Sequence, residues 1–170
     1  MKKEILKNKK GFTLIELLLY VGVTSFILTA VVSFTSVLLQ IQAKNKTVAE
    51  VEQQGAEVVQ VISQAIRNSN GINSPSSGAS ATSLSIGMDD ASKNPTIFSV
   101  NTGVLQVSEG ANTYYLTNSK VTMVNLSFSN LSRDGTPGVV KFSFTLSYVN
   151  NDERSEFNYD KTFQASASLR

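Results

Sequence analysis

The chain has 170 residues, with 15 Lys or Arg, 13 Asp or Glu, no cysteine and no histidine. Without cysteine there is no disulfide and no thiolate chemistry, and without histidine the commonest general base and transition-metal ligand are missing. The composition therefore argues against most hydrolases and zinc sites, and the length leaves room for one globular domain besides an anchor.

A basic tip followed by a long apolar run opens the chain. Lys9 and Lys10 lie in the tip, and no charged residue occurs between Leu17 and Leu39. At about 1.5 Å per helical residue this run is long enough to cross a hydrocarbon core of roughly 30 Å. Its serine and threonine hydroxyls can bond to backbone carbonyls one turn earlier. The sequence thus predicts a single membrane span, with the lysines held on the cytoplasmic side.

Glu16 places a carboxylate at the start of this span. Such a charge costs about 2.5 to 3.5 kcal/mol at the centre of a membrane helix and less near its end, so it needs a cationic partner. Lys9 and Lys10 are the nearest cations within the chain. A cut between Gly11 and Phe12 would instead create an α-amine four residues before Glu16, which can pair with this carboxylate or with that of a neighbouring subunit.

The sequence Lys-Lys-Gly-Phe-Thr-Leu-Ile-Glu-Leu at residues 9–17 resembles the cleavage and N-methylation motif of type IV pilins and type II secretion pseudopilins. The resemblance covers the first fifth of the chain. It implies that prepilin peptidase cuts after Gly11 and methylates the new amine of Phe12. It also implies that Glu16 serves assembly by compensating the N-terminal charge of an adjacent subunit, and that Lys9 and Lys10 supply the leader charge.

Four segments follow from this reading: a leader at 1–11, a transmembrane and assembly helix at 12–40, an amphipathic helix half at 41–73, and a globular head at 74–170. Without the leader, which holds five lysines and Glu4, 10 basic and 12 acidic side chains remain, so no nucleic-acid partner is expected.

The amphipathic half shows a stripe of small and apolar residues at alternating steps of three and four, which predicts a face packed on the head. The stripe contains Val48, Val51, Gly55, Val58, Ile62, Ala65 and Ser69. We expect the helix to run from Phe12 to about Asn68, and to stop before Asn73 with a left-handed cap at Asn70–Gly71 and Pro75 beyond it.

Short alternating segments predict strands in the rest of the chain, after a flexible linker at 75–81. The expected strands are 83–88, 96–100, 104–107, 113–117, 121–129, 139–149 and 156–169, with 104–107 and 113–117 forming a hairpin. The alanines of the last strand predict that it lies close to the helix. The expected fold class is α+β, a long N-terminal transmembrane-plus-amphipathic helix packed on an antiparallel β-sheet, which is the pilin fold that the resemblance implies.

The resemblance implies a structural subunit of a type IV pilus or a type II secretion-like filament, with no enzymatic activity and no cofactor or metal. Its partners would be prepilin peptidase, other pilin or pseudopilin subunits, and an inner-membrane assembly platform with a cytoplasmic ATPase. The protein would begin in the cytoplasmic membrane with its head outside, and then enter an extracellular or periplasmic filament. Ser33 stands where major subunits usually have proline, and the chain has no disulfide. Together with a loose likeness at 61–69 and 162–170, these departures indicate a minor J-type or W-type subunit.

Two other readings compete with this one. A conventional signal peptide has a shorter apolar region and a clear small-residue cleavage site, which this chain lacks. A bitopic membrane-anchored binding or adhesion protein that never polymerises fits the span but gives no reason for Glu16. Phe98, Tyr114 and Tyr115 are the aromatic residues that such a protein would use for binding, although burial in strands is the simpler expectation for them. The adjacent Asp89 and Asp90 are read as solvated loop residues.

Overall fold

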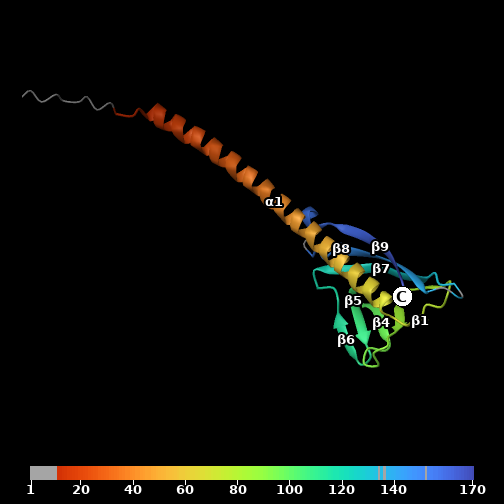
Figure 1. Ribbon diagram of the computed structural model, residues 1–170. Coiled ribbons are helices and arrows are strands. Elements are labelled where there is room, and N and C mark those ends of the chain that lie inside the picture. Colours follow the sequence, from red (N-terminus) through yellow and green to blue (C-terminus); the bar gives the residue numbers. More distant parts are fainter. Residues whose placement is uncertain (1–10, 134, 136, 152) are drawn as a thin grey trace, which may run out of the picture. The chain divides into compact units, whose positions relative to one another are not determined.

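The computed structural model describes residues 11–133, 135, 137–151 and 153–170, and it has one long helix followed by nine strands (Figure 1). The elements in chain order are α1 (Leu14–Arg67), β1 (Gly71–Ser74), β2 (Ser80–Ala81), β3 (Leu84–Gly87), β4 (Thr96–Asn101), β5 (Val104–Glu109), β6 (Asn112–Tyr115), β7 (Val121–Asn130), β8 (Val139–Tyr148), the 3-10 helix η1 (Ser155–Phe157) and β9 (Asp160–Ser168). This arrangement confirms the predicted α+β fold class. The chain forms two compact units that divide within α1, one up to Gln42 and the other, the head, from Ala43 to Arg170.

The helix ends within one residue of the predicted position near Asn68, but its cap differs from the prediction. It stops at Arg67, and the backbone N–H and the hydroxyl of Ser69 both donate to the carbonyl of Ile66, at 3.2 and 2.7 Å. The predicted left-handed cap at Asn70–Gly71 is wrong, because neither residue has a positive φ and Gly71 already opens β1. The range 41–73 assigned to the helix therefore runs a few residues too far, since its last three residues belong to a strand.

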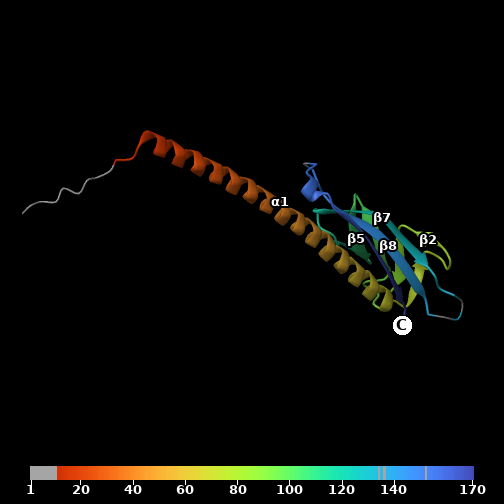
Figure 2. The ribbon, with the colours of Figure 1, turned by 90° about the horizontal axis from the view of Figure 1, so that it is seen from above.

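The strands form two antiparallel sheets where the sequence analysis expected one. The five-stranded sheet has the order β1-β3-β4-β5-β6 and the four-stranded sheet the order β2-β7-β8-β9. Figure 2 shows β2, β7 and β8 of the four-stranded sheet, with β2 at its edge. The predicted hairpin is confirmed, because β5 and β6 pair from Gln106 opposite Tyr115 to Glu109 opposite Asn112.

The segment 75–81, predicted to be a flexible linker, is held in place. Its last two residues form β2, in which Ser80 pairs with Ser129 and Ala81 with Phe128 of β7. In addition, the buried side chain of Asn130 donates to the carbonyl of Pro75 at 2.8 Å. The chain therefore leaves the five-stranded sheet after β1, adds β2 to the four-stranded sheet, and returns to the five-stranded sheet at β3. A two-residue strand does not reveal this crossing in a sequence pattern.

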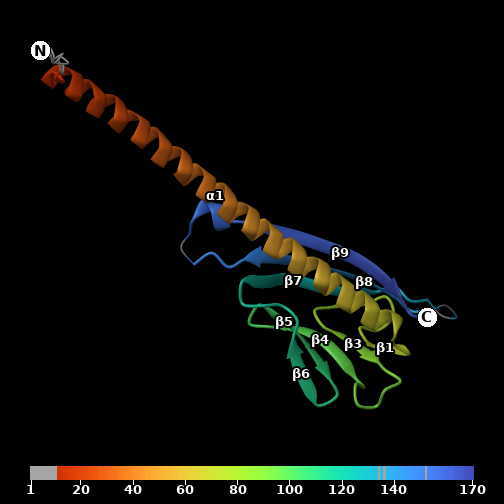
Figure 3. The same ribbon diagram turned by 60° about the vertical axis from the view of Figure 1, so that its left-hand side comes forward.

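One hydrophobic core joins the C-terminal part of α1 to both sheets. Val51, Gly55, Val58 and Ile62 are buried on the helix, as the stripe predicted. At its two ends the stripe rotates slightly, so that Thr47 and Ile66 are buried while Val48 and Ala65 are only half-buried. Figure 3 shows this part of α1 lying along β9, β8 and β7 and passing over β1 and β3. The sheets contribute Leu84, Ile86, Phe98, Leu105, Val121, Met123, Phe128, Val140, Phe142, Phe144 and Leu146.

The strands of the four-stranded sheet show how the core faces are built. In β8 the alternation is confirmed, with Val140, Phe142, Phe144 and Leu146 buried. In β7 the buried residues change parity at a bulge around Asn125, which has a φ of 55° and so lets Leu126 and Phe128 face the same core as Met123.

The last strand begins at Asp160 rather than Glu156, because residues Ser155–Phe157 form η1. Its predicted closeness to the helix is confirmed, but by a different residue type. A Cβ added to Gly55 would overlap the ring of Phe163, so the small residue that permits close packing lies on the helix and the large one on the strand.

Candidate processing and assembly site

The proposed cleavage position lies just ahead of α1. Gly11 and Phe12 are not helical, and the side chain of Phe12 is 74% exposed. A Cβ built on Gly11 contacts nothing within 4 Å, so packing in the described part of the chain does not require a glycine here. Lys9 and Lys10, predicted to supply the leader charge, lie outside the described residues.

Thr13 and Glu16 form the N-terminal cap of α1. The helix begins at Leu14, two residues later than predicted, because Thr13 takes the capping position. The backbone N–H of Glu16 donates to the Thr13 hydroxyl oxygen at 3.3 Å, and the N–H of Leu17 donates to the Thr13 carbonyl at 3.1 Å. A threonine followed three residues later by glutamate is the capping-box pattern, and a negative charge in the first turn also complements the helix dipole. Glu16 therefore has a local role that the sequence analysis missed, although the Thr-x-x-Glu spacing carried the signal.

Tyr20 is a second neighbour of Glu16 that the sequence analysis did not single out. Its hydroxyl donates to Oε1 of Glu16 at 3.5 Å. Its ring also meets the ring of Phe12 edge to face, with centroids 6.0 Å apart and an interplanar angle of 62°. The structure thus brings Phe12, Glu16 and Tyr20 together at the start of the apolar segment. Glu16 and Tyr20 are four residues apart on the helix and so lie on one side of it, and Phe12, which precedes the helix, joins them through its ring contact with Tyr20.

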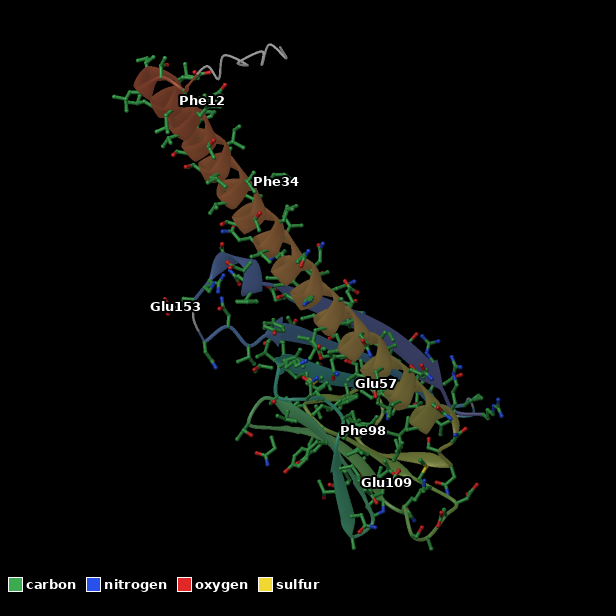
Figure 4. All side chains as sticks on the ribbon, turned by 90° about the vertical axis from the view of Figure 1, so that its left-hand side faces the viewer. Phe12, Phe34, Glu57, Phe98, Glu109 and Glu153 are labelled. Atoms are coloured by element: carbon green, nitrogen blue, oxygen red, sulfur yellow. The ribbon has the colours of Figure 1, made fainter. Side chains whose placement is uncertain are left out.

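The rest of the N-terminal unit is an apolar helix with exposed side chains. Every residue from Gly11 to Gln42 is exposed, including Phe12 and Phe34, which are labelled in Figure 4. Within the described residues, α1 is the one helix long and apolar enough to cross a membrane, and none of its most apolar stretch is buried.

Hydroxyl side chains in this segment bond to the helix backbone, as predicted. Ser25, Thr29, Ser33, Thr35 and Ser36 each donate to the carbonyl four residues earlier, at 2.8 to 3.0 Å. Because their donors are used within the helix, these residues can face lipid or another helix without an unsatisfied hydroxyl.

Charged side chains of the head hold α1 on two sides. Glu50 accepts hydrogen bonds from the side chains of Asn118 at 2.7 Å and Lys120 at 3.3 Å, and these contacts lower its pKa. Glu52 accepts from Lys161, at 2.6 Å to each oxygen, and from the hydroxyl of Tyr159 at 3.1 Å. The hydrogen bond from Lys161 lowers the pKa of Glu52 and raises that of Lys161.

The other candidate residues lie apart from the N-terminal site. Phe98 is a core residue, whereas Tyr114 and Tyr115 on β6 are 52% and 69% exposed, contrary to the expectation that strand burial would cover them. Asp89 accepts a hydrogen bond from the Asn70 side chain at 3.0 Å, and Asp90 accepts from Ser92. Among the described residues no group of three or more His, Cys, Asp or Glu is placed to hold a metal ion.

Comparison with known families gives one match, at the N-terminus. Residues 6–32 match the family described as the prokaryotic N-terminal methylation motif. No curated protein and no solved structure gives a significant match to the chain. The matched residues contain Gly11, Phe12 and Glu16 and continue into the exposed apolar helix. Together with the helix-on-sheet architecture, this motif supports the type IV pilin-like family for the chain.

Proposed function

We propose that this protein is a structural subunit of a type IV pilus or a type II secretion-like filament, matured by prepilin peptidase between Gly11 and Phe12. The observation that carries the proposal is the methylation motif at residues 6–32, which ends inside an exposed apolar helix. The pilin-like family that this motif supports is structural rather than enzymatic.

Maturation would start at the cytoplasmic face of the membrane. A peptidase needs an accessible, non-helical bond, and residues 11–13 precede the first helical residue, Leu14. The open space around Gly11 leaves room for an enzyme to approach the backbone. In this scheme Lys9 and Lys10 keep the leader cytoplasmic, the peptidase methylates the new amine of Phe12, and the head lies outside the membrane.

Assembly would exchange lipid for neighbouring helices around the apolar segment. An assembly platform powered by a cytoplasmic ATPase would lift the mature subunit, and Glu16 would pair with the methylated amine of Phe12 on the next subunit. Removing two charges from water offsets most of the attraction between them, so we assign this pair to register rather than to strength. The small side chains of Gly22, Ser25 and Thr29 recur at helical spacing and permit close approach of another helix.

We assign the chain to the minor subunits of J or W type. Ser33 occupies the position at which major subunits usually have proline, and its hydroxyl bonds to the carbonyl of Thr29 at 2.9 Å. The helix passes through this position without interruption. A minor subunit would initiate or tip the filament rather than form its length.

The test is the intact mass and the first residue of the protein isolated from its native membrane, for the natural chain and for Gly11→Leu. We expect the natural chain to begin at Phe12 and to carry one added methyl group, and we expect Gly11→Leu to keep its leader. Gly22→Leu is the matched control, because a Cβ at Gly22 also contacts nothing within 4 Å. The control should be cleaved and methylated normally.

A natural chain that still begins at Met1 would contradict the proposal. The remaining reading would then be a bitopic membrane-anchored binding or adhesion protein. Its head carries two exposed aromatic side chains, Tyr114 and Tyr115, that offer a place to look for a ligand.

A further inference from the structure

Tyr20 is the one tyrosine within α1, and it lies in the apolar segment four residues after Glu16. Side chains on an α-helix lean toward its N-terminus, so a residue at position i+4 reaches back over residue i. Tyr20 does so, placing its hydroxyl 3.5 Å from Oε1 of Glu16. A leucine or valine here would fit the apolar run equally well, so the hydroxyl calls for an explanation.

The Tyr20 hydroxyl is the single side-chain donor to the Glu16 carboxylate among the described residues. Of the other hydroxyls nearby, that of Ser25 donates to the carbonyl of Val21, and that of Thr13 accepts the backbone N–H of Glu16 and makes no hydrogen bond to its carboxylate. A carboxylate without a donor is costly at the edge of a hydrocarbon phase, so a hydroxyl directed at it is favourable there even across a long contact. The phenol of Tyr20 therefore supplies the side-chain donor that no other residue of the described segment gives to the Glu16 carboxylate.

The ring of Tyr20 makes a separate contact with Phe12. The two rings meet edge to face, at 6.0 Å between centroids, although Phe12 precedes the helix by two residues. This contact keeps Phe12, Glu16 and Tyr20 on one side of the segment. It also limits the rotamers of Tyr20, so the hydroxyl stays directed toward Glu16.

We propose that Tyr20 is a positioning residue for Glu16. Its hydroxyl holds the carboxylate, and its ring holds Phe12 on the same face, until the amine of a neighbouring subunit becomes the partner of Glu16. The inference rests on the proposed assembly role of Glu16. It adds that Tyr20, on the same helix, is the partner of Glu16 before assembly. Tyr20 thereby keeps the two groups of the inter-subunit pair oriented before assembly.

The first experiment measures the contact directly in the purified full chain in lipid nanodiscs. The tyrosine doublet in ultraviolet resonance Raman spectra reports whether a phenol donates a strong hydrogen bond. We expect the spectrum to change between the natural chain and Glu16→Gln, and we expect this change to be absent when both chains carry Tyr20→Phe. The other four tyrosines cancel in these difference spectra. If Glu16→Gln leaves the tyrosine doublet unchanged, the proposal is overturned.

The second experiment measures the fraction of the protein that enters filaments. Tyr20→Phe keeps the ring contact with Phe12 and removes only the hydroxyl, and we expect a loss of about three- to tenfold, the effect of one hydrogen bond. In a Glu16→Gln background the same substitution should cause no further loss. Ser25→Ala, which removes a hydroxyl bonded to its own helix, should leave incorporation unchanged.

If Tyr20→Phe lowers the fraction of protein in filaments equally in the natural and the Glu16→Gln backgrounds, the positioning role is overturned, because Tyr20 would then act independently of the carboxylate. Normal incorporation of Tyr20→Phe would do the same. Failure of the proposed function has a different signature. The natural chain would then keep its leader and enter no filament, while the Raman comparison would still decide whether Tyr20 holds Glu16.

Discussion

The two parts of α1 differ in what their side chains contact, although they form one continuous helix. From Leu14 to Gln42 every residue is exposed, whereas the part from Ala43 to Arg67 buries Thr47, Val51, Gly55, Val58, Ile62 and Ile66 in the head. Apolar side chains exposed on all faces are stable in lipid or among other helices, and a single buried face is typical of a helix on a globular domain. The exposed apolar side chains of the first part therefore need lipid or other helices around them, whereas the second part packs on the head of its own chain.

Polar side chains follow the same division. In the first part they bond within the helix, as Tyr20 does to Glu16 and Ser33 to the carbonyl of Thr29. In the second part several of them reach other elements, as Lys44 does to the carbonyl of Asn158 at 2.6 Å and Glu52 to Lys161, whereas Thr47 still donates within the helix to the carbonyl of Ala43. Substitutions in the first part should therefore spare the stability of the head, and substitutions in the second part should reduce it.

The largest contrast should come from two phenylalanines. Phe144 is fully buried and stacks on Phe163 with centroids 5.3 Å apart, whereas Phe26 is 78% exposed. We expect Phe144→Ala to lower the free energy of unfolding of the head by about 3 to 5 kcal/mol, because a large buried side chain leaves a cavity. Phe26→Ala should leave it unchanged. Thermal unfolding of the full chain in detergent, followed by near-ultraviolet circular dichroism, measures the stability of both variants. Equal losses of stability would contradict the distinction between the two parts of α1.

Two glycines of α1 give a smaller but sharper contrast. A Cβ at Gly55 would overlap the ring of Phe163, so Gly55→Ala forces the helix and β9 apart and should cost about 1 to 3 kcal/mol of head stability. A Cβ at Gly22 contacts nothing within 4 Å, and Gly22→Ala should favour the helix by up to about 1 kcal/mol. The same unfolding measurement, with circular dichroism at helical wavelengths for Gly22→Ala, tests the pair. A Gly55→Ala head as stable as the natural one would show that Phe163 can move aside freely.

The sequence predicted the features that depend on a repeating pattern. The buried face of α1 around Val58 and the alternation of β8 around Phe144 follow from periodicity, and periodicity depends only on nearby residues. The split into two sheets depends instead on where Thr82 and Ser83 cross between β2 and β3, which two short strands do not specify. The bulge at Asn125 could not be predicted either, because one residue in the left-handed conformation inside a strand shifts the alternation of buried and exposed residues by one position.

At the N-terminal site the motif predicted which residues matter but not how they contact one another. Gly11, Phe12 and Glu16 were found from their order in the chain, and their proposed roles still await the mass measurement. Thr13 and Tyr20 were missed because a threonine and a tyrosine in an apolar run look like ordinary tolerated residues. Their contacts with Glu16 appear only when the helix start at Leu14 is known, since that start sets the capping position.

The smallest effect should come from the charged contact of Glu52, and it should depend on pH. The hydrogen bond from Lys161 holds the pKa of Glu52 below its ordinary value of 4.5, so this contact stabilises the head above about pH 4.5 and is lost as the pH falls through the folded pKa. Both side chains are 40% exposed, so solvent screening keeps the effect small.

Thermal unfolding of the natural chain and of Glu52→Gln between about pH 7 and pH 3 isolates this contact, because the lowered pKa of Glu50 affects both chains alike. The melting temperature of Glu52→Gln should be lower at pH 7 and should approach that of the natural chain at pH 3. Glu57→Gln is the matched control, since Glu57 is exposed on the same helix and has no hydrogen bond to another described residue's side chain. A gap between the natural chain and Glu52→Gln that stays constant down to pH 3 would mean that Glu52 stabilises the head by packing its side chain on β9 and not by its charge.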